Sequence, residues 1–218
     1  MKKFIIVLAA LLVLLFSIWA VTKKDRSEPD FPTPVAPEKP VIYLYPLEET
    51  TVTVTLDYDG ILDFTYPLYD NGWRMLASPD GTLIDCADGK QYNSLFWEGH
   101  GNTELDFSHG FVVAGSDTVA FLQEKLSYMG LEQNELNEFI VYWGPRLQPN
   151  EYNLITFQGD SYTDSAKLSI TPEPDSILRI FMACQPLSEK IEIPKQELLP
   201  FKRTGFAVVE WGGCEIAQ

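Results

Sequence analysis

The segment Thr51–Tyr58 alternates between polar and apolar side chains at every position. Because successive side chains of a β-strand point to opposite faces, this pattern predicts a half-buried strand. The alternation resumes at Leu62, after Asp59-Gly60. A loop of about three residues, with Gly60 in the left-handed conformation, would place Leu56 opposite Leu62 and keep the apolar side chains on one face. The sequence therefore predicts a β-hairpin over residues 51–66.

Further strand and turn signals lie on both sides of this hairpin. The segment 41–46 is β-branched and aromatic and is bounded by prolines, which favours a strand at a sheet edge. Downstream, Ser78–Thr82 contains Pro-Asp-Gly and separates 73–77 from 83–85, and Asp88-Gly89 separates that strand from 92–97. Residues 41–112 are thus predicted to form an antiparallel meander.

The apolar spacing then changes to that of a helix. Ser116-Asp117 can start a helix and Gly130 can end it, with apolar residues at helical spacing between them. A second apolar stripe runs from Leu136 to Trp143, with Glu132 and Glu135 near its start and Gly144-Pro145 expected to end it. The aromatic and Met positions of these stripes are interpreted as core, and the helical pair is expected on one sheet face.

Strand signals return after the helices, at 154–157, 166–170, 176–183, 191–193 and 206–211. The predicted fold class is therefore α+β: an antiparallel β-sheet meander with an inserted helical pair, followed by further antiparallel strands.

The N-terminus indicates export. A basic start is followed by an apolar run of 18 residues, Phe4–Val21, interrupted only by Ser17. At about 1.5 Å per residue this run is long enough to cross a bilayer. We favour an uncleaved anchor over residues 1–24; a cleaved signal peptide, which would give a secreted protein, is the alternative. Residues 25–40 carry regularly spaced prolines typical of an extended linker. Residues 41–218 then suit one extracytoplasmic domain.

The charge of the exported part narrows the range of partners. The first 24 residues hold four lysines and no acidic residue, so the rest carries 12 basic and 31 acidic residues, a formal charge of −19. This balance argues against nucleic acid and against direct binding to anionic lipid.

Three cysteines, Cys86, Cys184 and Cys214, are too few for a disulfide scaffold. If one bridge forms, Cys184–Cys214 is favoured; three unpaired thiols are the alternative. The absence of CxxC leaves a zinc knuckle or a thioredoxin-type redox pair without support.

Two Trp-Glu pairs are the strongest candidates for a site. Glu98 follows Trp97, and Glu210 precedes Trp211. Glycoside hydrolysis needs two carboxyl groups about 5–10 Å apart, and a neighbouring tryptophan can stack on a sugar or raise a carboxyl pKa. Glu98 and Glu210 are therefore the catalytic candidates, with Asp63 and Asp106 as alternatives.

Both histidines, His100 and His109, lie close to acidic residues and could contribute to a ligand site. Their spacing matches no HExxH or comparable metal motif, so they are interpreted as exposed loop residues and no metal or cofactor is predicted. Trp97, His100, His109 and Trp211 are the ligand-binding candidates.

Three motifs together resemble a family of exported, mostly uncharacterised bacterial proteins that carry a KPVIYLYP motif. They are Lys39–Pro46, Leu95–Gly99 and Val209–Gly213. The resemblance covers the domain from Lys39 onward and implies an exported protein, but it implies no activity.

The sequence favours a membrane-tethered extracytoplasmic module of the cell envelope, with an interaction or structural role and a protein or glycan partner. A glycan hydrolase of the envelope, acting through Glu98 and Glu210, is the alternative.

Overall fold

The computed structural model describes residues 38–101 and 103–216. The predicted anchor, residues 1–24, and nearly all of the predicted linker lie outside these residues. Within the described part of the chain, no helix is long and apolar enough to span a membrane.

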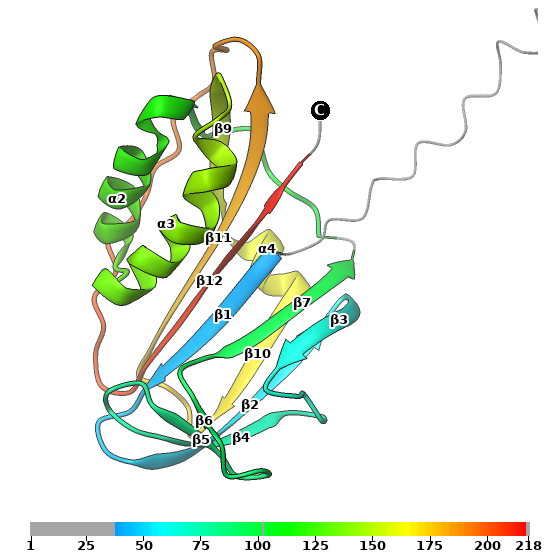
Figure 1. The fold of residues 1–218 in the computed structure, drawn as a ribbon, viewed down its shortest axis with the longest axis vertical. Coiled ribbons are helices and arrows are strands. Elements are labelled where there is room, and N and C mark those ends of the chain that lie inside the picture. The colour runs from blue at the N-terminus through cyan, green and yellow to red at the C-terminus, as the bar shows by residue number, and fades with distance from the viewer. Residues whose placement is uncertain (1–37, 102, 217–218) are drawn as a thin grey trace, which may run out of the picture. The chain divides into compact units, whose positions relative to one another are not determined.

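The larger of two β-sheets, here called the large sheet, has seven strands in the order β3-β7-β1-β12-β11-β9-β8 (Figure 1). Adjacent strands of this sheet run antiparallel, except that β11 and β12 are parallel. The strands are β1 (Glu38–Tyr45), β3 (Gly60–Tyr66), β7 (Leu95–Gly101), β8 (Phe111–Ala114), β9 (Tyr152–Gln158), β11 (Ser176–Leu187) and β12 (Ala207–Glu215).

The small sheet has five strands in the order β10-β2-β4-β5-β6. These are β2 (Thr50–Tyr58), β4 (Trp73–Ala77), β5 (Leu83–Asp85), β6 (Gln91–Tyr92) and β10 (Ala166–Thr171). The predicted turn at Ser78–Thr82 joins β4 to β5, with Ala77 opposite Leu83 and Gly81 at a φ of 86°. The Asp88-Gly89 turn joins β5 to β6. The single strand predicted over 92–97 is wrong, because β6 ends at Tyr92 in the small sheet and β7 begins at Leu95 in the large sheet.

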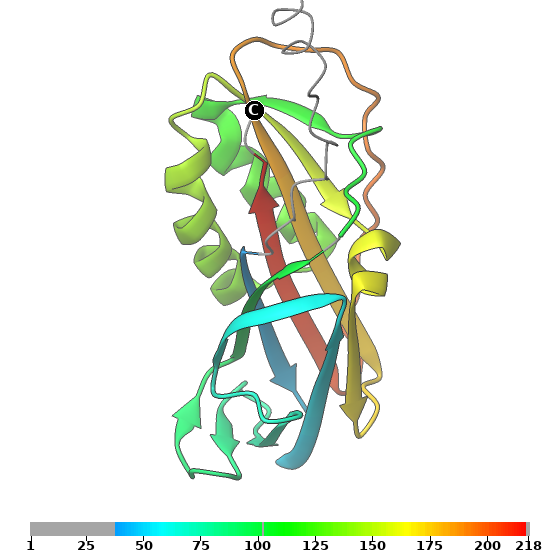
Figure 2. The same cartoon turned by 90° about the vertical axis from the view of Figure 1, so that its right-hand side faces the viewer.

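Helices α2 (Thr118–Met129) and α3 (Gln133–Leu147) cover one face of the large sheet (Figures 1 and 2). Their stripes, including Leu122, Phe139 and Trp143, pack with Val209 and Trp211 in one core. A second core lies between the two sheets. The predicted α+β architecture, mostly antiparallel with an inserted helical pair, is confirmed. A short 3-10 helix, η1 (Gly115–Asp117), and α4 (Asp160–Ser165) were not predicted.

The second helix passes through the proline that was expected to stop it. Pro145 lies inside α3, which ends at Leu147. Proline removes one helical hydrogen bond, to the carbonyl four residues earlier. Here that carbonyl belongs to Val141. Arg146 donates from Nη1 to the next carbonyl, that of Tyr142, at 2.6 Å.

The predicted hairpin between residues 51–58 and 62–66 is wrong, because its two strands belong to different sheets. Leu56 lies opposite Leu168 of β10, whereas Leu62 lies opposite Gly99 of β7. The chain changes sheets at Asp59-Gly60, where Asp59 N–H donates to the Ser165 carbonyl at 2.7 Å. Gly60 is required for close packing rather than a left-handed turn, since a Cβ there would lie 2.4 Å from the His100 carbonyl oxygen.

Two further strand predictions need correction. β1 lies between β7 and β12, so it is not an edge strand. Its Pro40 is accommodated because the pairing with β12 is irregular between Glu38 and Val41. Residues 191–193 form no strand; they belong to the irregular segment 188–206 that links β11 to β12, here called the strap.

The tyrosines of the Lys39–Pro46 motif bond the large sheet to α3. Tyr43 donates its hydroxyl to Glu138 and Tyr45 donates to Glu135, both at 2.8 Å. A third bond runs in the opposite direction: the Tyr142 hydroxyl on α3 donates to the Glu38 carboxylate of β1 at 2.9 Å. Burial, reinforced by Glu138, raises the pKa of Tyr43 well above its ordinary value.

This raised pKa predicts an alkaline loss of stability. Because folding favours neutral Tyr43, its contribution is complete below the unfolded pKa of about 10 and declines above it, by about 1.4 kcal/mol per pH unit. Urea unfolding at pH 9 and pH 11 should therefore show a steeper loss for the native chain than for Tyr43→Phe. Equal losses in the two proteins would contradict the assignment.

All three cysteines are free. Cys184 belongs to the core under the helices and Cys214 to the core between the sheets, so these thiols point to opposite faces of the large sheet. The favoured Cys184–Cys214 bridge is therefore absent, for a geometric reason. Burial raises the pKa of Cys214 to about 12, which keeps it a thiol.

A thiol count tests this arrangement. Cys86 is exposed, whereas Cys184 and Cys214 are buried. Ellman's reagent should titrate one thiol per folded chain and all three after unfolding in guanidinium without reductant. A count of one after unfolding would show a disulfide and overturn the opposite-face assignment.

Candidate functional site

The structure places the two Trp-Glu pairs on strands separated by β1. Ile42 of β1 is opposite Glu210 on one side and Leu95 on the other. Trp97 belongs to the core between the sheets, and Trp211 belongs to the core under the helices. Because neighbouring side chains of a strand alternate, Glu98 lies on the helical face and Glu210 on the opposite face. The two carboxylates therefore do not flank a common space, which glycoside hydrolysis requires.

Glu210 is the centre of a buried polar cluster. Its side chain is fully buried; Arg179 Nε donates to Oε2 at 2.6 Å and Trp97 Nε1 donates to Oε1 at 3.3 Å. Burial disfavours the charged guanidinium, but the Glu210 charge outweighs this and raises the pKa of Arg179. Burial, together with Glu210, raises the pKa of the neighbouring Tyr162 well above its ordinary value. Both carboxylate oxygens of Glu210 are thus occupied by internal partners, as in a structural ion pair.

Neither candidate tryptophan offers a surface to a ligand. Trp97 and Trp211 are both 0% exposed. The ring of Trp97 lies 5.0 Å from that of Tyr58, and the ring of Trp211 lies 5.2 Å from that of Phe139. Trp211 Nε1 also donates to the Tyr43 hydroxyl at 3.2 Å. Both rings are therefore core residues.

The two histidines are exposed and have separate partners; His109 lies in a loop as predicted, whereas His100 lies on strand β7. His100 Nδ1 lies 2.8 Å from Asp63 Oδ2, and His109 Nδ1 lies 3.0 Å from Ser108 Oγ. The carboxylate of Asp106 accepts from the Ser108 backbone N–H. Within residues 38–101 and 103–216, no group of three or more His, Cys, Asp or Glu side chains could hold a metal ion.

Hollows adjoin the strap near β8 and β9. One, of about 640 Å³, is lined mainly by polar residues and includes His109 and Asp106. Another is an open groove between α2 and the strap, and its lining is more apolar.

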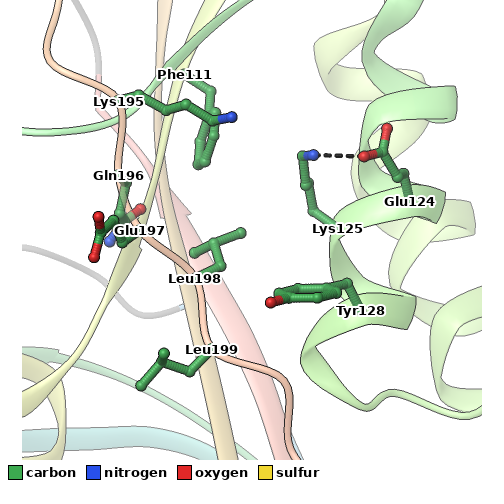
Figure 3. Close-up of a pocket in the computed structure, with 9 residues that line it drawn as sticks. All are labelled: Phe111, Glu124, Lys125, Tyr128, Lys195, Gln196, Glu197, Leu198 and Leu199. Carbon is green, nitrogen blue, oxygen red and sulfur yellow. Dashed lines mark hydrogen bonds and ion pairs between the residues drawn. The ribbon is translucent and has the colours of Figure 1, made fainter.

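This groove has a volume of about 570 Å³, and Figure 3 shows the residues that line it. Leu198 and Lys195 from the strap and Tyr128 from α2 point into the space between them, while Leu199 turns away (Figure 3). The groove is lined by Phe111, Glu124, Lys125, Tyr128 and residues 195–199. It therefore combines apolar walls with two lysines and two glutamates.

A further hollow of about 420 Å³ continues this groove along β8. The two share Phe111, Glu124, Lys125 and Lys195. The further hollow adds Val112 and Val113 of β8, Phe121 of α2, and residues 190–193 of the strap. Together they form a channel, here called the α2–strap groove. It holds no constellation of acid, base and nucleophile, and its shape suits an extended ligand.

The structure also explains why the strap stays in place beside this groove. The side-chain amide of Gln196 bonds both backbone groups of Phe157. It accepts from the Phe157 N–H at 2.9 Å and donates to the Phe157 carbonyl at 2.6 Å. Arg203 donates to the Gly130 carbonyl at 2.8 Å and forms an ion pair with Glu135. The groove thus has two fixed walls. Sequence reasoning missed it because the strap has no periodic pattern beyond Lys190–Ile193, where charged and apolar residues alternate.

Comparison with known proteins gives a partial similarity. The chain is 45% identical over 64 residues to the "Uncharacterized protein in bglA 3'region" of Butyrivibrio fibrisolvens, which covers 28% of this chain and 65% of that protein. The chain thus spans less than two thirds of this relative. No family model matches the chain, and no solved structure matches it. The similarity relates the chain to an uncharacterised bacterial protein and attaches no activity to it.

Proposed function

We propose that this chain is a membrane-tethered, extracytoplasmic interaction module of the bacterial cell envelope, and that the α2–strap groove binds a protein partner. The observation that carries the proposal is the groove itself. It is open to solvent, has apolar side chains from three elements and lysines between them, and its walls are fixed by Gln196 and Arg203. Clefts of a few hundred Å³ with mostly apolar walls and a few polar groups are typical binding sites.

The tether is supported by the sequence. The apolar run Phe4–Val21 precedes a proline-rich segment, and the first regular element begins at Glu38. An extended linker of this composition would separate the domain from the bilayer. The hydrolase alternative gains no support from the fold, because Glu98 and Glu210 face opposite sides of the large sheet.

The location is tested by protease treatment of intact cells that express the full-length chain. We expect the chain in the membrane fraction, with the domain cleaved by external protease. A matched variant with Leu12→Arg and Leu14→Arg should leave the membrane fraction, because each arginine costs about 3 kcal/mol at the centre of a span. A chain that stays in the soluble cytosolic fraction would contradict the proposal.

Binding in the groove is tested by site-specific photocrosslinking in the same cells. A photoreactive residue in place of Tyr128 should give a discrete adduct, whereas the same residue in place of Val141, which is exposed on α3, should give none. The captured protein, once identified and purified, should bind the native chain at least about tenfold more tightly than a Tyr128→Asp variant. Equal affinity for both chains would show that the groove is not the binding site.

A further inference from the structure

β8 forms an edge of the large sheet, and its backbone faces the groove. Among the strands of the described residues it pairs only with β9, with Val112 opposite Leu154 and Val113 opposite Asn153. The hollow beside it is bounded by α2 and by strap residues 190–193. An open sheet edge in such a position is a template for a further strand.

The direction of the free backbone groups follows from Gly110. Gly110 N–H donates to the Pro194 carbonyl at 2.9 Å, and the Gly110 carbonyl accepts from Gln196 N–H at 3.4 Å. Gly110 therefore uses both groups on the side away from β9. In an antiparallel ladder, alternate residues direct their N–H and C=O groups to the same side. Val112 consequently directs its N–H and C=O away from β9, and among the described residues no backbone hydrogen bond joins them to the strap segments that line the hollow.

The side chains around this edge define what would fit there. Phe111 and Phe121 give the hollow an apolar wall, and three lysines line it: Lys125, Lys190 and Lys195. Lys125 forms an ion pair with Glu124, whereas no ion pair of the described residues involves Lys190 or Lys195. Glu124 and Glu192 line the same hollow, so the three lysines leave it with a net charge of +1. Because Lys190 and Lys195 have no ion-pair partner there, and the exported part has a formal charge of −19, the site favours acidic side chains.

We infer that the partner contributes an extended segment of alternating apolar and acidic residues, which adds to β8 as an eighth strand of the large sheet. The inference rests on the proposed function, because it specifies the partner of the same groove. The backbone of Val112 pairs with the segment, an apolar side chain lies against Phe111, and acidic side chains lie near Lys190 and Lys195. Backbone pairing supplies affinity, and the side-chain contacts supply specificity.

The opposite edge of the large sheet is a poorer template. Although β3 is exposed, its pairing with β7 is irregular between Leu62 and Phe64, which leaves Asp63 as a bulge bonded to His100. Bulges and charged residues on an edge strand hinder pairing with another chain. β8 has no such irregularity in its pairing with β9.

The test uses the full-length chain in neutral phosphatidylcholine nanodiscs and a blocked octapeptide of alternating valine and glutamate, labelled with fluorescein. We expect saturable binding by fluorescence anisotropy. Methylation of the peptide nitrogens along the pairing edge should weaken it by about tenfold or more, because backbone hydrogen bonds are lost. Replacement of glutamate by lysine should weaken it by about tenfold or more as well, because like charges then face each other.

Variants of the chain give the matched comparison. Val112→Pro deletes the outward N–H at an edge position that tolerates proline, and Lys195→Glu reverses one charge in the groove. Both should weaken peptide binding by about tenfold, whereas Lys167→Glu, an exposed charge reversal in the small sheet, should leave it unchanged. Hydrogen exchange at the Val112 amide should slow on binding, and exchange at Val113 should not change.

Three outcomes would overturn the inference. Equal binding of methylated and unmethylated peptides, together with a loss in Tyr128→Asp, would exclude strand addition while leaving the groove as a binding site. Saturable binding of dodecyl phosphate measured by calorimetry, with no binding of either peptide, would identify an anionic amphiphile instead. No binding of any of these probes would overturn strand addition, and the crosslinking experiment would then decide the proposed function on its own.

Discussion

Replacing Glu210 by alanine is expected to lower the free energy of unfolding by about 3–5 kcal/mol. Glu210 is fully buried, and the side chain of its partner Arg179 is 9% exposed. Removing the carboxylate leaves the guanidinium buried without a counter-charge and removes the acceptor of the Trp97 Nε1 hydrogen bond. Urea unfolding of the native and variant chains, followed by tryptophan fluorescence, measures the loss.

The matched control is Glu98→Ala. Glu98 lies on the same sheet and adjoins a tryptophan in the same way, but it is half-buried and makes no ion pair within the described part of the chain. We expect a change of no more than about 0.5 kcal/mol. The double variant Glu210→Leu with Arg179→Met should recover most of the stability, because a buried ion pair can be exchanged for apolar packing at little cost. Similar small losses for both glutamates would contradict the structural role of Glu210.

The two Trp-Glu pairs show that a local sequence pattern does not reveal which face of a sheet a side chain occupies. Sequence order alone places Trp97 before Glu98 and Glu210 before Trp211. If Trp97 and Glu210 share a face, strand alternation must put Glu98 on the other face with Trp211. The relative face of two strands depends on their register with the strand between them. That register is fixed by the contacts of Ile42 across β1, which the sequence does not reveal.

Strand pairing was harder to predict than strand position for a similar reason. The alternation of Thr51–Tyr58 located β2, and the turn residues correctly paired β4 with β5. The strands on either side of Asp59-Gly60 were expected to pair because they are neighbours in the chain. They separate because β2 pairs with β10, more than 100 residues later, and β3 pairs with β7. Because the chain changes sheets through pairing with this distant strand, the turn residues at Asp59-Gly60 do not predict the change.

Replacing Glu135 by alanine is expected to lower the free energy of unfolding by about 3–5 kcal/mol, although the sequence identified it only as an acidic residue in a first helical turn. Its side chain is 1% exposed and forms an ion pair with Arg203 of the strap. It also accepts from the Tyr45 hydroxyl and from the Glu132 backbone N–H, each at 2.8 Å. One substitution therefore removes a buried counter-charge, a helix cap and a bond to β1.

The neighbouring Glu132→Ala is the control that separates burial from position in the helix. Its side chain is 74% exposed and lies 3.8 Å from Arg203, so this pair is worth about 1 kcal/mol or less. Glu132 also caps the N3 position of α3 with its side chain, which adds roughly 1 kcal/mol. Urea unfolding should rank Glu135→Ala well below Glu132→Ala in stability.

Because Arg203 holds the strap to α3, strap residues near Arg203 should also exchange their amide hydrogens faster in Glu135→Ala than in Glu132→Ala. Equal exchange in the two variants would show that the strap is held by Gln196 and its packing alone.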